Sequence, residues 1–135
     1  MRKKVRFEVL SLKQADVDVH KYSRPRQKTD TEGLTAQVRE GEGYVELVLL
    51  RGFCPTGGYD LEVLSVNTEV DDEGVSIILD LINPEPDAVV TMMFTRPGRV
   101  VRIPKQDLPN SKEISFAVKD SNKHLLDRAV LSTVS

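Results

Sequence analysis

The sequence has little of the chemistry on which most enzymes and cross-linked domains depend. It contains one cysteine, two histidines and no tryptophan, and aromatic residues make up 5% of the chain. Because Cys54 is the single cysteine, an internal disulfide is excluded, and too few thiols and imidazoles are present to favour a closed zinc site. No glycine-rich phosphate-binding motif occurs either. We therefore expect no catalytic residue, no metal and no cofactor, and a protein that is not an enzyme.

An excess of charge and a long apolar run are also missing. Nineteen basic residues stand against 21 acidic ones, for a net charge of −2, so no global field gathers nucleic acid or acidic lipid. No apolar run approaches the roughly 18 residues of a membrane-spanning helix. The basic N-terminus is not followed by the apolar stretch of a signal peptide, because Arg6, Glu8, Ser11 and Lys13 interrupt it. We expect no nucleic-acid or membrane partner, and a cytoplasmic protein unless a leader has been removed.

What the chain has in abundance is the pattern of β-strands. Valine is frequent and alanine scarce, and branched side chains suit a pleated sheet. Apolar residues alternate with polar ones in several short segments, and turn signals such as Asp-Glu-Gly and Pro-Gly separate them. The expected strands cover residues 5–9, 44–50, 59–63, 75–81, 89–95, 101–103, 114–118 and 125–131, the last of which also fits a helical period.

About 7–9 short strands in 135 residues indicate a single all-β domain, an antiparallel β-sandwich with an immunoglobulin-like arrangement. Its exposed edge strands allow a monomer or a weak dimer. We divide residues 1–135 into an N-terminal strand with a long polar loop (1–43), a central region (44–109) and C-terminal strands (110–135).

The long polar segment from His20 to Gly43 is unusual in a compact domain. Two interpretations stay open. It is a surface loop, or it is a contact arm in which Arg24, Arg26 and Lys28 meet an acidic partner.

Cys54 is the first candidate for a reactive group. A nucleophilic interpretation pairs it with His20 or His124, because a catalytic cysteine needs a base or a helix N-terminus that favours its thiolate. Cys54 precedes a proline at the end of a strand, and no helix is expected after it. We therefore favour a small, half-buried residue that shapes a turn.

Two charged clusters are weaker candidates. Asp71–Glu73 ends in a glycine turn and lacks the spacing of a calcium loop, so it is expected to be solvated. Four basic residues surround one predicted hairpin, but strand alternation divides them between two faces and no aromatic residue lies among them. These residues are Arg96, Arg99, Arg102 and Lys105.

The most distinctive segment joins an apolar strand to an alternating one: Pro55, Thr56, Gly57, Gly58 and Tyr59. Proline fixes its own φ angle, while the two glycines permit positive φ and leave the backbone without side chains. Such a corner is either a plain turn or a recognition tip that offers backbone hydrogen bonds to a partner. In the second interpretation Tyr59 packs inward and holds the base of the loop.

The region from Tyr44 to about Pro109, which contains this corner, resembles the C-terminal domain of the PrcB family, the protease-complex subunit. The shared features are an apolar strand leading into Pro-Thr-Gly-Gly-Tyr, an alternating strand, the proline-containing stretch Asn83–Asp87, a further strand, and Val100–Pro104. The resemblance implies a β-sandwich-like domain that binds a protein partner, with a protease as the candidate, and it implies nothing catalytic.

The loop is also similar to that of chagasin-type inhibitors of cysteine proteases, which present an NPTTGY-like loop on an immunoglobulin-like sandwich. Pro55, Thr56, Gly58 and Tyr59 match that motif, and Gly57 replaces a threonine. The tryptophan that those inhibitors carry in a second loop has no counterpart in this chain. Protease inhibition through the loop is therefore an alternative function, and a small-ligand or strand-addition module with a purely structural loop is a second alternative.

Overall fold

The computed structural model describes residues 2–18, 33–69, 74–93, 95–109 and 112–132. Its strands are β1 (Arg2–Lys4), β2 (Glu8–Leu10), β3 (Leu34–Glu40), β4 (Tyr44–Arg51), β5 (Asp60–Glu69), β6 (Gly74–Ile82), β7 (Gly98–Pro104), β8 (Glu113–Lys119) and β9 (Leu125–Ser132), with one 3-10 turn, η2, over Lys105–Asp107. The described residues contain no helix of the length and apolarity that a membrane crossing needs.

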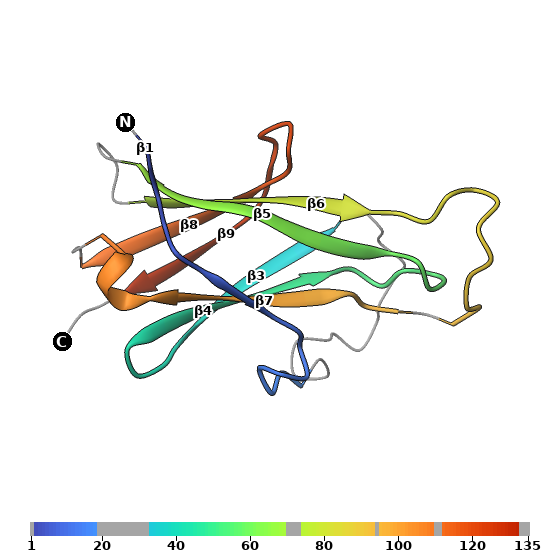
Figure 1. The fold of residues 1–135 in the computed structure, drawn as a ribbon, viewed down its shortest axis with the longest axis horizontal. Helices are drawn as coiled ribbons and strands as arrows, with labels where there is room; N and C mark the ends of the chain where they lie inside the picture. Colours follow the sequence, from blue (N-terminus) through green and yellow to red (C-terminus); the bar gives the residue numbers. More distant parts are fainter. Residues whose placement is uncertain (1, 19–32, 70–73, 94, 110–111, 133–135) are drawn as a thin grey trace.

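The strands form two sheets packed face to face, as the predicted β-sandwich requires (Figure 1). One sheet has the order β1-β5-β6-β8-β9 and the other the order β2-β7-β4-β3. Neighbouring strands are antiparallel except for β6 and β8, which run parallel. The purely antiparallel prediction is wrong for this pair, because β7 belongs to the opposite sheet and the chain re-enters the first sheet in the direction of β6.

The core lies between the sheets and comes from alternate residues of the long strands. β4 is the most buried strand, as its apolar run predicted, since it lies between β7 and β3. Phe116 from β8 adds a fully buried aromatic ring to this core. The later strands behave as expected, and β9 is a strand rather than a helix.

The N-terminal segment differs from its prediction. Residues 5–9 alternate as one strand does, but the chain changes sheets there: β1 pairs with β5, and β2 pairs with β7. Val5 is buried, whereas Val9 is 40% exposed at the sheet edge. After β2 the chain covers the outer face of the four-stranded sheet, where Ala15 is buried against Val48 and its neighbours.

The predicted polar loop of residues 20–43 is shorter than expected. Residues 34–40 form β3, which pairs along its whole length with β4. Leu34, Ala36 and Val38 alternate with polar residues here, which is a strand signal that the surrounding polar stretch obscured. His20, Arg24, Arg26, Lys28 and the turn Asp71–Glu73 lie outside the described residues.

The expected strand over residues 89–95 is also wrong. Val89 is fully exposed, and in the described part of this segment the strand-like pairing is an isolated bridge between Thr95 and Cys54. The segment belongs instead to a long connection from β6 to β7, which projects at the end of the sandwich remote from both termini (Figure 1).

Candidate functional site

The Pro55–Tyr59 corner lies at the same end of the sandwich as the β6–β7 connection, and the two are joined by backbone hydrogen bonds. The Gly57 N–H donates to the Thr91 carbonyl at 2.8 Å, and Cys54 and Thr95 exchange two bonds of 2.7 and 2.9 Å. The Thr95 hydroxyl donates to the Thr56 carbonyl at 2.8 Å. We call residues 53–59 together with residues 83–93 the apex.

These contacts and the two glycines show how the backbone of the corner is used within the fold. Gly58 adopts φ of +90°, and a Cβ there would lie 2.8 Å from the Pro84 side chain and 3.0 Å from that of Val90. A Cβ on Gly57 would meet Thr91 at 3.4 Å, which is an ordinary contact. Gly58 therefore serves the local fold, and the Gly57 N–H and the Thr56 carbonyl are used within the molecule rather than offered to a partner.

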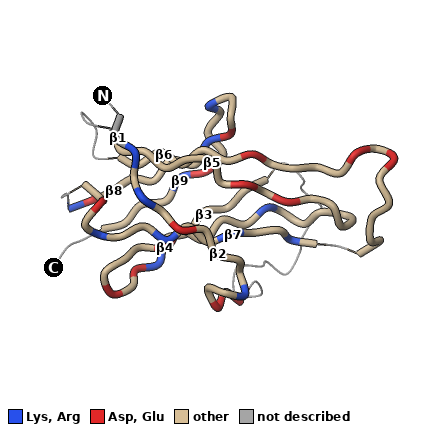
Figure 2. The backbone as a smooth tube through the Cα atoms, in the orientation of Figure 1, with Lys and Arg blue, Asp and Glu red and all other residues tan. Residues whose placement is uncertain are grey.

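The most exposed apolar side chains of the apex come from the β6–β7 connection. Val89 is 103% exposed, Met92 84% and Met93 66%. Glu85 and Asp87 precede this part of the loop in the sequence, and residues 88–93 carry no charge, as the tan stretch of the projecting loop illustrates (Figure 2). Three large apolar side chains on one projecting loop are unusual for a surface that contacts only water.

The base of the apex is held by Arg51, the last residue of β4, whose side chain is fully buried. Its Nη1 donates to the carbonyls of Asp60 and Ile82, each at 2.8 Å, and its Nη2 donates to Asn83 Oδ1 at 2.8 Å. Asp60 begins β5 directly after the first apex segment, and Ile82 ends β6 directly before the second. One side chain of the four-stranded sheet therefore ties both apex segments to the five-stranded sheet.

Tyr59 contributes to the same base but is not a core residue. Its ring is partly buried, and the Arg51 guanidinium lies over it, 5.3 Å from the ring centroid. The predicted inward packing of Tyr59 is therefore a contact with a buried cation rather than with the apolar core.

Cys54 is fully buried, and its Sγ lies 3.6 Å from the Gly52 carbonyl. His124, the proposed base, is exposed in the β8–β9 turn and is engaged with Asp120, whose carboxylate accepts the His124 backbone N–H. The structure does not bring Cys54 and His124 together. No group of three or more His, Cys, Asp and Glu side chains suited to a metal occurs in the described part of the chain.

The basic residues around β7 are distributed among separate partners rather than gathered into a patch. Arg99 pairs with Asp60 at 2.9 Å, and Lys105 pairs with Glu40 at 2.6 Å. Arg96 lies over the Phe53 ring and donates to a backbone carbonyl. Burial lowers the pKa of Arg96.

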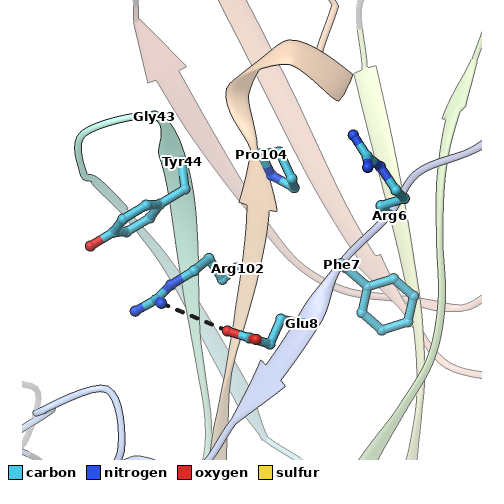
Figure 3. A pocket seen from close by; sticks show the side chains of 7 residues that line it. All are labelled: Arg6, Phe7, Glu8, Gly43, Tyr44, Arg102 and Pro104. Carbon is cyan, nitrogen blue, oxygen red and sulfur yellow. Dashed lines mark ion pairs between the residues drawn. The ribbon is translucent and has the colours of Figure 1, made fainter.

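Arg102 belongs to a shallow pocket at the opposite end of the sandwich (Figure 3). It stacks on Tyr44 at 4.3 Å, pairs with Glu46 at 2.8 Å and lies 3.7 Å from Glu8. Glu46 also accepts a hydrogen bond from Arg39. Burial raises the pKa of Glu46, but the hydrogen bonds and charges of the two arginines outweigh it and hold this pKa below its usual value. Because its charges are already paired, this pocket is a weaker candidate than the apex.

Sequence reasoning missed Arg51 and the exposed side chains Val89, Met92 and Met93. An arginine that ends an apolar strand resembles any solvated strand end, so no sequence signal distinguished it. For the loop a signal existed: residues 88–93 follow two prolines, are apolar except for Thr91, and lack the regular alternation of a strand.

Comparison with known proteins found a family match for the central part of the chain. The family model described as PrcB C-terminal matches residues 47–104, which extend from within β4 to the end of β7 and include the whole apex. No curated protein and no solved structure matches the chain. The similarity to chagasin-type inhibitors and the immunoglobulin-like arrangement stay predictions.

Proposed function

We propose that this chain, whose residues 47–104 match the PrcB C-terminal family, is a non-catalytic protein-interaction domain that binds its partner through the apex. The family name points to a domain of the protease-complex-subunit type, and a protease is the partner class that we favour.

The exposure of three large apolar side chains on a clamped loop carries the proposal. Val89, Met92 and Met93 project into solvent, while hydrogen bonds from Gly57 and Arg51 fix the segments beneath them. A loop that is ordered before binding loses less conformational entropy when a partner docks. Methionine side chains also adapt to the shape of the surface that they meet.

In this proposal the Pro-Thr-Gly-Gly-Tyr corner contributes mainly by position. Pro55 and Gly58 are exposed and extend the contact surface, whereas Gly57 anchors the neighbouring loop through its hydrogen bond to Thr91. Replacement of Gly57 with a bulky residue is therefore expected to weaken partner binding by displacing Thr91.

The proposal is tested with paired surface variants. The double variant Met92→Ser/Met93→Ser removes apolar surface from the apex, and Leu125→Ser/Val130→Ser removes comparable exposed surface from β9. Proteins captured by the wild type are identified and purified, and their Kd values for all three forms are measured by calorimetry. We expect binding to be weakened by the apex variant alone. Equal affinity for the wild type and the apex variant would refute the proposal.

Inhibition is tested separately with a panel of cysteine and serine proteases. We expect no active-site inhibition, because the Gly57 N–H and the Thr56 carbonyl are engaged within the apex. Competitive inhibition that is lost in a Thr56→Ala/Tyr59→Ala variant would instead favour the inhibitor function.

A further inference from the structure

The edge of β5 between Asp60 and Leu64 has no strand beside it among the described residues. β1 pairs with β5 only at residues 67–69, and the Val5 N–H adds one bond to the Val66 carbonyl. The chain then crosses to the other sheet, so the half of β5 nearest the apex is left uncovered (Figure 1).

A groove of about 340 Å³ lies along this edge. Its lining residues are Val9, Asp60, Leu61, Glu62, Val63, Ile82 and Arg99. Val9 and Ile82 are each about 40% exposed, so the groove offers apolar surface next to the strand edge.

The main-chain groups of Leu61 point toward the groove. The Leu61 N–H does not bond to β6 but to its neighbour's carboxylate, Asp60 Oδ1, at 2.8 Å. Main-chain groups two residues apart in a strand point the same way, and the register with β6 is continuous from Asp60 to Val63. The N–H and C=O groups of Val63 therefore face the groove as well.

The Asp60 carboxylate acts as a removable cap on this edge. Its other oxygen, Oδ2, pairs with Arg99 Nη2 at 2.9 Å. When a carbonyl oxygen of an added strand accepts the Leu61 N–H, Asp60 loses one hydrogen bond and keeps its partner Arg99. The Leu61 N–H is thus satisfied in the free protein. An added strand exchanges one carboxylate acceptor for a carbonyl and offsets that exchange with further ladder bonds, such as those to Val63.

The charges of the groove define the occupant. Asp60 and Glu62 face one cation, Arg99, so the groove favours a peptide with basic side chains. Two copies of this chain paired antiparallel about Glu62 would place Glu62 opposite Glu62, and pairing about Leu61 would place it opposite Asp60. Like charges directly opposite are destabilising. We propose that residues 60–64 of β5 are a strand-addition site for an extended, basic peptide segment of a partner protein.

The test uses three fluorescein-labelled octapeptides. The first, Thr-Lys-Val-Lys-Val-Lys-Val-Thr, is extended and basic; the second has Glu in place of Lys; the third has Pro in place of the central Val. We expect saturable fluorescence polarisation with the first peptide, binding about tenfold weaker with the second, and none with the third, because proline removes a ladder donor. In amide NMR spectra, the first peptide is expected to shift the Leu61 and Val63 signals.

Charge reversal provides the matched variants. Glu62→Lys is expected to reverse the preference between the Lys and Glu peptides, whereas Glu42→Lys, on the exposed β3–β4 turn, is expected to leave it unchanged. The apex variant Met92→Ser/Met93→Ser is expected to bind the Lys peptide with the wild-type affinity. The proposal for the β5 edge and the proposal for the apex can therefore be refuted separately. Equal binding of the Pro peptide, shifts away from Leu61 and Val63, or self-association through this edge would overturn the proposal.

Discussion

Replacement of Arg51 is the most decisive test of how the apex is built. The substitution Arg51→Met keeps a long, unbranched side chain and removes the guanidinium. The substitution removes at least three hydrogen bonds, to the carbonyls of Asp60 and Ile82 and to Asn83 Oδ1, each at 2.8 Å.

The magnitude comes from two opposing effects. A hydrogen bond from a charged group contributes about 1.5–3 kcal/mol, so three of them amount to roughly 5–9 kcal/mol before compensation. Removal of a buried charge relieves its desolvation penalty, and water reaches the acceptors of the exposed Asn83. We expect a net destabilisation of about 3 kcal/mol, a large share of the 5–15 kcal/mol of an ordinary domain.

Urea unfolding followed by circular dichroism measures this loss. With a denaturant slope of about 2 kcal/mol per molar, the midpoint falls by about 1.5 M. Arg99→Met is the matched control, because that side chain is one-third exposed (33%) and its ion pair with Asp60 is at the surface. The control is expected to lose less than about 1 kcal/mol.

Amide hydrogen exchange gives a second readout. In the Arg51 variant we expect faster exchange of the Gly57 N–H, which donates to Thr91 across the apex, and unchanged protection in β8. Equal midpoints for the Arg51 and Arg99 variants, or uniform loss of protection through both sheets, would show that Arg51 does not hold the apex in particular.

Three further predictions concern single residues. Gly58→Ala is expected to lower the free energy of unfolding by about 1–3 kcal/mol, because the new side chain combines a φ of +90° with a clash against Pro84. The control Gly57→Ala is expected to change it by less than about 1 kcal/mol. Thermal melts of the two variants measure the difference. The pKa of Glu46 is lowered in the folded state. The ionised Glu46 carboxylate therefore contributes its full share of folding stability above the unfolded pKa of about 4.3. That share is lost as the pH falls through the folded pKa. The stability difference between wild type and Glu46→Gln in urea should therefore shrink below about pH 4, and a constant difference would contradict this. Cys54 is fully buried and should react with Ellman's reagent only as fast as the protein opens, so immediate labelling would refute its burial.

The sheets were predictable where one face of a strand is buried. In β6, Val75, Ile77 and Leu79 alternate because every second side chain enters the core. β3 shows the same alternation, with Leu34, Ala36 and Val38 packed toward the core. It escaped prediction because this short run lies within a long, mostly polar segment, which is typical of a loop. Residues 89–95 failed in the opposite way: branched and apolar side chains suggested a strand, but Val89 and Met92 are exposed to solvent rather than packed in a sheet.

The sequence indicated where the candidate site lies but not which contacts hold its segments together. The glycines of the corner correctly indicated an unusual backbone, since Gly58 has a positive φ. Their purpose was not predictable, because the contact of Gly58 with Pro84 joins segments that lie far apart in the sequence. Arg51 was hidden for the same reason, as its acceptors Asp60 and Ile82 belong to the other sheet.

The apex and the β5 groove are contiguous, and Arg51 is common to both. Its two backbone acceptors, on Asp60 and Ile82, belong to residues that line the groove, and Asn83, its side-chain acceptor, begins the apex loop. A partner that places a basic strand on β5 therefore lies directly next to the apex, whose first segment ends where β5 begins. Since one buried guanidinium fixes both surfaces before a partner arrives, Arg51→Met should weaken the Lys peptide and the apex partner together, although neither touches Arg51 directly. Retention of either affinity in that variant would show that the two surfaces are positioned independently.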